Sequence, residues 1–266
     1  MSKQNHDIRS LILDMDGVLW KADDPIGDLP QIFEEIRQRN LKVALATNNS
    51  TRTVDQYVER LAGFGVNLER WQIVTSSEAV AYTLKKQFPE GGPVFIIGET
   101  GLIRSLEEKG FYHSYDGALA VVAGMDRQLT YEKLRQATVL IRSGVPFYGT
   151  NPDRTFPTPY GLIPGTGSIL TAIEVASDVT PCILGKPAPG MYQVAMERLG
   201  TTEKQTLVVG DRLDTDIAGA QKLGCLSALV LSGVTSPERA REWHPAPDWI
   251  TADLSTLIRI LPARPG

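Results

Sequence analysis

Cysteine is scarce in this sequence, and two motifs that would indicate other chemistries are missing. The 266 residues include two cysteines and no Cys-x-x-Cys pair, so zinc-ribbon and thioredoxin chemistry are not indicated. We expect both, Cys182 and Cys225, to be small buried apolar side chains in a reducing compartment. The pattern Gly-x-x-x-x-Gly-Lys-Ser/Thr is also absent, which argues against a P-loop enzyme acting on nucleoside triphosphates.

Long apolar runs and concentrated positive charge are missing as well. The longest apolar run lies near residues 118–125, too short to cross a bilayer, and the first ten residues do not look like a signal peptide. We therefore expect a cytoplasmic protein with no membrane partner. The net charge is -4, and no basic run could neutralise a phosphate backbone, so nucleic-acid polymers are not expected partners. A small phosphorylated metabolite needs only a local positive site.

A regular alternation of short β-branched runs with helical periods is present instead. Strands are predicted at residues 8–13, 42–46, 206–209 and 228–231, and helices at 30–39, 53–64 and 215–223. Several of these strands are apolar on consecutive residues, which is typical of strands buried on both faces. The pattern predicts an α/β fold with a Rossmann-like parallel sheet and helices on both faces.

The middle of the chain carries an alternation of its own. Strands are predicted at 94–97, 119–123 and 146–148, and helices at 102–109, 131–141 and 168–175. Loop-like segments near 76–78 and 177–181 bracket this block. We therefore expect two domains: a core formed by residues 1–77 and 181–266, and an inserted α/β domain formed by residues 78–180.

The first chemically suggestive segment follows the strand predicted at residues 8–13. Asp14 and Asp16 are two positions apart, so in extended chain their side chains point the same way, and Gly17 lets the chain turn. Ligands of open parallel sheets bind at the carboxyl ends of the strands. Taken alone, a solvated turn explains this segment equally well.

Two further polar segments follow predicted strands or apolar runs. The second strand ends in four polar residues, Thr47, Asn48, Asn49 and Ser50. Their hydroxyls and the backbone N–H groups suit an anionic oxygen, although Ser50 also suits the capping of the next helix. Lys186 follows the apolar residues 182–184 and could neutralise a phosphate; a solvated surface lysine is the alternative.

Acidic residues collect again after the strand at 206–209, in the segment Gly-Asp-Arg-Leu-Asp-Thr-Asp at 210–216. Carboxylates that converge on one site repel each other unless a cation or a proton intervenes. Oxygen ligands without imidazole or thiolate favour Mg²⁺ over zinc or copper. Because all four segments belong to one α/β pattern, we expect them to meet along one edge of the sheet, with Mg²⁺ as cofactor.

In this order, the segments DMDGV, TNNS, GKP and GDRLDTD resemble the motifs of the haloacid dehalogenase superfamily of phosphohydrolases. The insert between TNNS and GKP resembles the branch with a type IIA cap, which includes NagD-type and p-nitrophenyl phosphatases. The segment TNPDRTFP at 150–157 also resembles that branch, whereas Val18 departs from the threonine of many members. The resemblance implies a Mg²⁺-dependent phosphatase acting on small phosphate monoesters.

The resemblance also implies roles for the motif residues. Asp14 would attack phosphorus to form an aspartyl-phosphate, and Asp16 would protonate the leaving alcohol and then activate water. Asp14, the backbone carbonyl of Asp16 and Asp211 would bind Mg²⁺, and Asp216 would orient a metal-bound water or Lys186 without binding the metal itself. The phosphoryl group would be bound by four residues: Thr47, Asn48, Asn49 and Lys186.

Several alternatives stay open at this point. A phosphomutase or a non-catalytic phosphometabolite-binding protein could use the same scaffold, whereas a dehalogenase would not need the acid Asp16. Asn151 and Arg154 are candidates for substrate contact from the inserted domain, and an Asn-Pro-Asp turn that only shapes the loop is the alternative. Sugar phosphates, nucleoside monophosphates, phosphoglycolate and pyridoxal phosphate all remain candidate substrates, and a homodimer joined through the inserted domain is left open.

Overall fold

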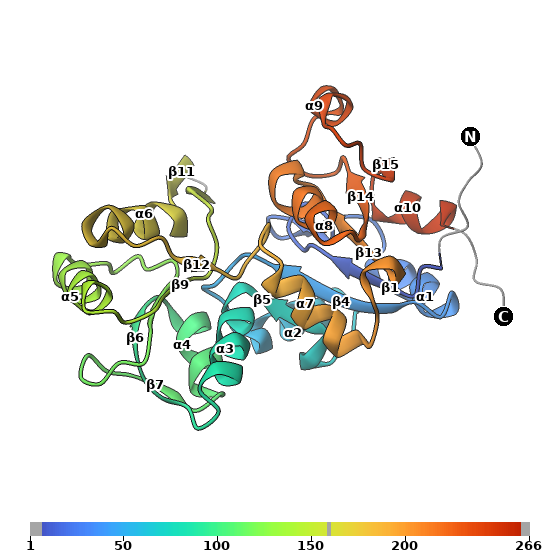
Figure 1. Cartoon of the computed structure of the whole chain (residues 1–266). Helices are drawn as coiled ribbons and strands as arrows, with labels where there is room; N and C mark the ends of the chain where they lie inside the picture. The colour runs from blue at the N-terminus through green and yellow to red at the C-terminus, as the bar shows by residue number, and fades with distance from the viewer. Residues whose placement is uncertain (1–6, 159–160, 262–266) are drawn as a thin grey trace. The chain divides into compact units, whose positions relative to one another are not determined.

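The computed structural model describes residues 7–158 and 161–261, which divide into two compact units (Figure 1). The first unit joins the segments 7–47, 57–74 and 192–261. The second unit joins Asn48–Gln56 with Thr75–Met191. From the sequence, the boundaries of the inserted domain are expected at residues 78 and 180. Those boundaries stay a prediction, and the two compact units have bounds of their own.

The first unit is built on a six-stranded sheet in the order β15-β14-β13-β1-β4-β5. Its strands are β1 (Ser10–Leu13), β4 (Lys42–Thr47), β5 (Ile73–Thr75), β13 (Thr206–Gly210), β14 (Leu226–Val230) and β15 (Trp249–Thr251). β1 pairs in parallel with both β4 and β13. In this register Leu13 lies opposite Leu45 on one side and Val209 on the other. The residues of β1 are fully buried, as the run of consecutive apolar side chains predicts.

Helices complete the first unit: α1 (Leu29–Gln38), α2 (Val54–Gly63), α7 (Gly190–Leu199), α8 (Ala218–Leu223), α9 (Pro237–Glu242) and α10 (Leu254–Ile260). α1 begins where the Asp28 carboxylate accepts a 3.1 Å hydrogen bond from the backbone N–H of Gln31. Ile32 and Ile36 are buried on one face of this helix, and α10 packs beside it (Figure 1). A short antiparallel hairpin, β2 (Trp20–Lys21) and β3 (Asp24–Pro25), follows β1.

The second unit contains a five-stranded sheet in the order β12-β9-β8-β6-β7. Its strands are β6 (Gly92–Ile97), β7 (Phe111–His113), β8 (Val121–Ala123), β9 (Phe147–Gly149) and β12 (Cys182–Ile183), and its helices are α3 (Ser76–Gln87), α4 (Thr100–Glu107), α5 (Tyr131–Arg142) and α6 (Thr166–Ser177). Phe95, Val121 and Phe147 from the sheet pack with Ile141 of α5 and Ile173 of α6 into one apolar cluster. The hairpin β10 (Thr155–Thr158) and β11 (Gly161–Pro164) precedes α6.

The prediction of an α/β fold with parallel sheets is confirmed, and two local expectations are wrong. Cys182 is exposed, because β12 is a short edge strand, whereas Cys225 is buried as expected. Residues 76–78 are not a loop but the first turn of α3, where the Thr75 hydroxyl accepts a hydrogen bond from the backbone N–H of Glu78. Among the described helices, none combines the length and apolar character that crossing a membrane requires.

Candidate active site

Three aspartates of the first unit converge at the carboxyl end of its sheet. Asp14 follows β1 and Asp211 follows β13, and the backbone N–H of Asp14 donates to the carbonyl of Val209 at 2.8 Å. Asp14, Asp211 and Asp216 each place one carboxylate oxygen within 4.8 Å of the others. Their exposed fractions are 8%, 1% and 1%, so all three acidic groups are almost fully buried.

Asp211 is held by a loop that the sequence analysis did not single out. Its carboxylate oxygen Oδ2 accepts a hydrogen bond from the backbone N–H of Val234 at 2.7 Å, and its carbonyl accepts one from the Thr235 hydroxyl at 2.6 Å. Two glycines border the carboxylate. A Cβ on Gly17, whose φ is +84°, would lie 2.5 Å from Asp211 Oδ2, and a Cβ on Gly233 would lie 2.5 Å from Asp211 Cγ. Glycine at both positions therefore makes room for this aspartate.

Asp216 reaches the cluster from a π-helical turn over Leu213–Ile217 (η3), which occupies the start of the helix predicted at 215–223. The backbone N–H of Arg212 donates to its Oδ2 at 3.2 Å. Such turns recur at functional sites because they redirect a side chain locally. Asp214 in the same turn is exposed and lies outside the cluster.

The donor set of this cluster fits a divalent magnesium ion. Three buried carboxylates repel each other strongly in a poorly solvated site, and a bound cation relieves that repulsion. All the ligand atoms of the cluster are carboxylate oxygens, the type that Mg²⁺ prefers, and imidazole and thiolate ligands are absent from it. The structure thus adds Asp216 to the candidate ligands Asp14 and Asp211, whereas the sequence analysis assigned it a supporting place.

The Asp16 side chain is not a member of this cluster. It is exposed, and its Oδ1 accepts a 2.9 Å hydrogen bond from the indole Nε1 of Trp20. Trp20 itself is fully buried, so it packs inside the first unit and does not present its ring to solvent. An exposed carboxylate beside the buried cluster can exchange protons with a reactant, whereas the cluster can hold a cation.

The polar residues after β4 fall into two groups. Thr47 ends the strand in the first unit and is buried. In the second unit, the Asn49 side-chain oxygen accepts hydrogen bonds from both the backbone N–H and the hydroxyl of Thr51, at 2.9 and 2.8 Å. The side-chain oxygen of Asn49 thus stabilises the turn between Asn49 and Thr51. Phosphate binding by Asn49 stays a prediction.

Asn48 connects two distant segments of the second unit. Its Oδ1 accepts from the backbone N–H of Lys186 at 2.8 Å, and its Nδ2 donates to the carbonyl of Lys186 at 2.9 Å. The same Nδ2 lies 3.3 Å from each carboxylate oxygen of Asp153. Lys186 is 3% exposed, which excludes the interpretation as a solvated surface lysine.

The loop that follows β9 folds back on Asn48. Asn151 is buried, and its Nδ2 donates to the backbone carbonyl of Asn48 at 2.7 Å, while its Oδ1 accepts from the backbone N–H of Asp153 at 3.1 Å. These contacts favour a loop-shaping role for Asn151. Arg154 is exposed. Contact of either residue with substrate stays a prediction.

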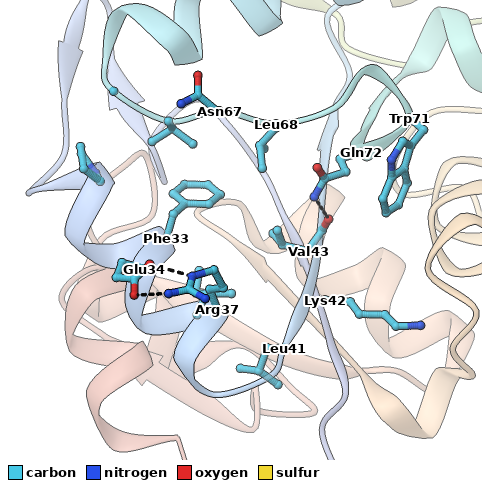
Figure 2. A pocket seen from close by; sticks show the side chains of 14 residues that line it. Phe33, Glu34, Arg37, Leu41, Lys42, Val43, Asn67, Leu68, Trp71 and Gln72 are labelled. Carbon is cyan, nitrogen blue, oxygen red and sulfur yellow. Dashed lines mark hydrogen bonds and ion pairs between the residues drawn. The ribbon is translucent and has the colours of Figure 1, made fainter.

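A surface pocket of about 500 Å³ lies elsewhere on the first unit, against α1 and β4 (Figure 2). Phe33, Leu41 and Leu68 line it with Trp71, and Gln72 donates to the carbonyl of Val43 at its edge (Figure 2). The pocket borders Lys42, the first residue of β4, whereas Thr47 is the last. It therefore lies at the amino end of the strand, away from the carboxyl end where sheets of this kind bind ligands.

Comparisons with known proteins agree with this geometry. Residues 11–112 match the family model described as haloacid dehalogenase-like hydrolase, and residues 183–257 match a second model of such hydrolases. An acid sugar phosphatase of Staphylococcus aureus is 34% identical over 94% of this chain and 96% of its own length. A 5'-nucleotidase of Bacillus subtilis is 34% identical over 86% of this chain and 90% of its own.

Solved structures show the same relationship. A p-nitrophenyl phosphatase from Archaeoglobus fulgidus superposes with a TM-score of 0.90 at 32% identity, covering 96% of this chain and all of its own. NagD from Escherichia coli gives 0.86 at 29% identity, covering 93% and 97%. A glycerol phosphate phosphatase of Mycobacterium tuberculosis in complex with magnesium gives 0.86 at 33% identity, covering 99% and 80%.

The chain belongs to the haloacid dehalogenase-like hydrolases, in the branch that contains NagD and the p-nitrophenyl phosphatases. Within that family it is a phosphoric monoester hydrolase.

Proposed function

We propose that this protein is a Mg²⁺-dependent phosphatase of small phosphate monoesters that acts through an aspartyl-phosphate on Asp14. The observation that carries the proposal is the buried cluster of Asp14, Asp211 and Asp216 at the carboxyl end of the sheet. Bound there, Mg²⁺ would neutralise the carboxylates and polarise the phosphoryl oxygens. The names of the relatives favour sugar phosphates or nucleoside monophosphates as substrates.

The chemistry proceeds in two steps at phosphorus. A carboxylate oxygen of Asp14 attacks phosphorus while the bond to the leaving oxygen breaks, and Asp16 donates its proton to that oxygen. Asp16 then takes a proton from water, whose oxygen attacks phosphorus and releases inorganic phosphate from Asp14. Thr47 and the residues after it bind the phosphoryl oxygens, and the buried ammonium of Lys186 offsets their charge. The exposed Arg154 contacts the leaving group in this proposal. We also propose that the protein is cytoplasmic.

Hydrolysis of p-nitrophenyl phosphate tests this function directly. The purified protein should require Mg²⁺ and lose activity in excess chelator, and Asp14→Asn should abolish turnover while the circular dichroism spectrum is unchanged. Asp211→Asn should raise the Mg²⁺ concentration needed for half-maximal rate, and Asp214→Asn, which changes an exposed neighbour, should leave it unaltered. Full activity of a folded Asp14→Asn variant would refute the covalent mechanism, and full activity in chelator would remove the metal.

A panel of phosphate monoesters then distinguishes the substrate classes. Sugar phosphates and nucleoside monophosphates should give the highest kcat/KM. Arg154→Ala should change the ranking among them more than it changes the rate with p-nitrophenyl phosphate, which offers few groups to recognise. An equal loss on every ester would mean that Arg154 does not select the substrate.

A further inference from the structure

The loop after β1 places a buried tryptophan against the exposed aspartate that follows the nucleophile. Trp20 Nε1 donates to Asp16 Oδ1 at 2.9 Å, and the carbonyl of Trp20 accepts a 2.7 Å hydrogen bond from the backbone N–H of Gly17. Asp16 and Trp20 also form an isolated β-bridge. The indole and the backbone therefore fix the same short loop from two sides.

Trp20 is itself held firmly within the first unit. Its ring is fully buried and stacks on Tyr57, with centroids 6.5 Å apart and planes 13° from parallel. Phe64 contacts it at a centroid distance of 6.0 Å. The Arg60 guanidinium lies 4.4 Å from the ring centroid, and it also donates to the carbonyl of Ala22 in the same hairpin.

In this arrangement the Arg60 guanidinium contacts the face of the Trp20 indole, and the indole N–H binds the Asp16 carboxylate. A cation over the face of an indole is attracted by the negative face of the ring and draws electron density from it, which strengthens the N–H as a donor. A buried indole N–H needs a partner, and here the partner is the charged Asp16 carboxylate, which makes the bond a charge-assisted one. Among residues 7–158 and 161–261, no other group donates to the Asp16 carboxylate.

We propose that Trp20 is the positioning residue of the acid and base Asp16. Its N–H occupies Oδ1 and fixes the carboxylate rotamer, so Oδ2 is the oxygen that passes a proton to the leaving group and later takes one from water. An exposed aspartate without this donor would sample several rotamers, and only some of them would serve the reaction. The inference rests on the proposed function, because it assigns a task within the proton transfer.

The test removes the N–H while it keeps the packing. β-(3-Benzothienyl)alanine incorporated at position 20 retains the bicyclic shape but carries sulfur in place of N–H, and Trp20→Phe is the simpler companion variant. Phe64→Leu is the matched control, because it alters the ring contacts of Trp20 and leaves the donor in place. Each protein is assayed with substituted phenyl phosphates whose leaving groups range from p-nitrophenol to phenol, after circular dichroism confirms the fold.

A loss of proton transfer has a distinct kinetic pattern. With the benzothienyl variant, we expect kcat/KM, which reports the step that forms the aspartyl-phosphate, to fall tenfold or more on phenyl phosphate and less than threefold on p-nitrophenyl phosphate. Asp16→Asn should show the same dependence on the leaving group, and Phe64→Leu should not. Equal losses of kcat/KM across the series, or unchanged kinetics in the folded variant, would overturn the positioning role.

A second measurement does not depend on turnover. Labelling with ¹⁵N-tryptophan gives one indole N–H resonance for each of the four tryptophans, and Trp20→Phe identifies the resonance of Trp20. Asp16→Asn should shift that resonance and speed its exchange with solvent. If the wild-type enzyme hydrolyses no phosphate ester, the proposed function fails. If the chemical shift and the solvent exchange of the Trp20 N–H are the same in Asp16→Asn as in the wild type, the positioning proposal fails whatever the activity.

Discussion

Gly233→Ala is a small change that should weaken the metal site without replacing any acidic residue. The Asp211 side chain packs against the backbone of Gly233, and an added Cβ would lie 2.5 Å from both Cβ and Cγ of Asp211. The φ of Gly233 is outside the left-handed region, so alanine can adopt this backbone. The clash therefore has to be relieved by movement of the Asp211 carboxylate or of the loop.

The structure sets the scale of the effect. Overpacking by one methyl group costs about 1–3 kcal/mol. Asp211 is 1% exposed, so its side chain has little space in which to move aside. If the cost appears as a displaced ligand, roughly 1.4 kcal/mol corresponds to a tenfold change in a dissociation constant, so the affinity for Mg²⁺ should fall by roughly 5- to 150-fold.

The assay is the Mg²⁺ dependence of p-nitrophenyl phosphate hydrolysis, with Tm measured on the same samples. Gly63→Ala is the matched control, because Gly63 ends α2 and an added Cβ there meets nothing within 4 Å. That control should keep the wild-type Mg²⁺ requirement and gain about 0.5–1 kcal/mol of stability. If Gly233→Ala lowers Tm but needs no more Mg²⁺ than Gly63→Ala, the loop moves instead of the carboxylate and the reasoning is refuted.

Three further predictions follow from the second unit and the two cysteines. Lys186→Ala should lower kcat at least tenfold while the Mg²⁺ requirement is unchanged; unchanged kcat would mean that the buried ammonium does not act on the phosphoryl group. Asn48→Asp removes the Nδ2 donor to Lys186 and should lower kcat, whereas Asn67→Asp, at an exposed position, should not. Equal rates for the two variants would mean that the clamp, the pair of hydrogen bonds between the Asn48 amide and the Lys186 backbone, is not needed for catalysis. Burial raises the pKa of the Cys225 thiol to about 12, so at pH 8 a disulfide reagent should titrate only the exposed Cys182 in the native enzyme and both thiols in denaturant; two fast equivalents in the native state would contradict this.

The core of the site could be predicted because its residues follow strands. Asp14 and Asp211 come directly after apolar runs that form neighbouring strands, and the position of such residues follows from the parallel sheet alone. Val234 and Gly233 could not be found in this way, because the hydrogen bond from Val234 to Asp211 crosses 23 positions and the segment has the composition of an ordinary turn.

Other parts of the prediction failed or stayed open for equally local reasons. The polar start of α3 resembled a loop because the residues that cap a helix are also those that form turns. Cys182 was expected to be buried because its apolar neighbours gave no sign that β12 is an edge strand. The clamp between Asn48 and Lys186 joins residues 138 positions apart, and no periodicity reports such a pair.

That clamp has a consequence for how the sequence can vary. The Asn48 amide offers one acceptor and one donor to the N–H and C=O of a single residue, as a neighbouring β-strand would. Aspartate lacks the donor, serine is too short to span both groups, and glutamine is longer by one methylene. Position 48 therefore tolerates almost no substitution, even though its side chain carries no charge. A library of all amino acids at this position, selected for phosphatase activity, should return asparagine.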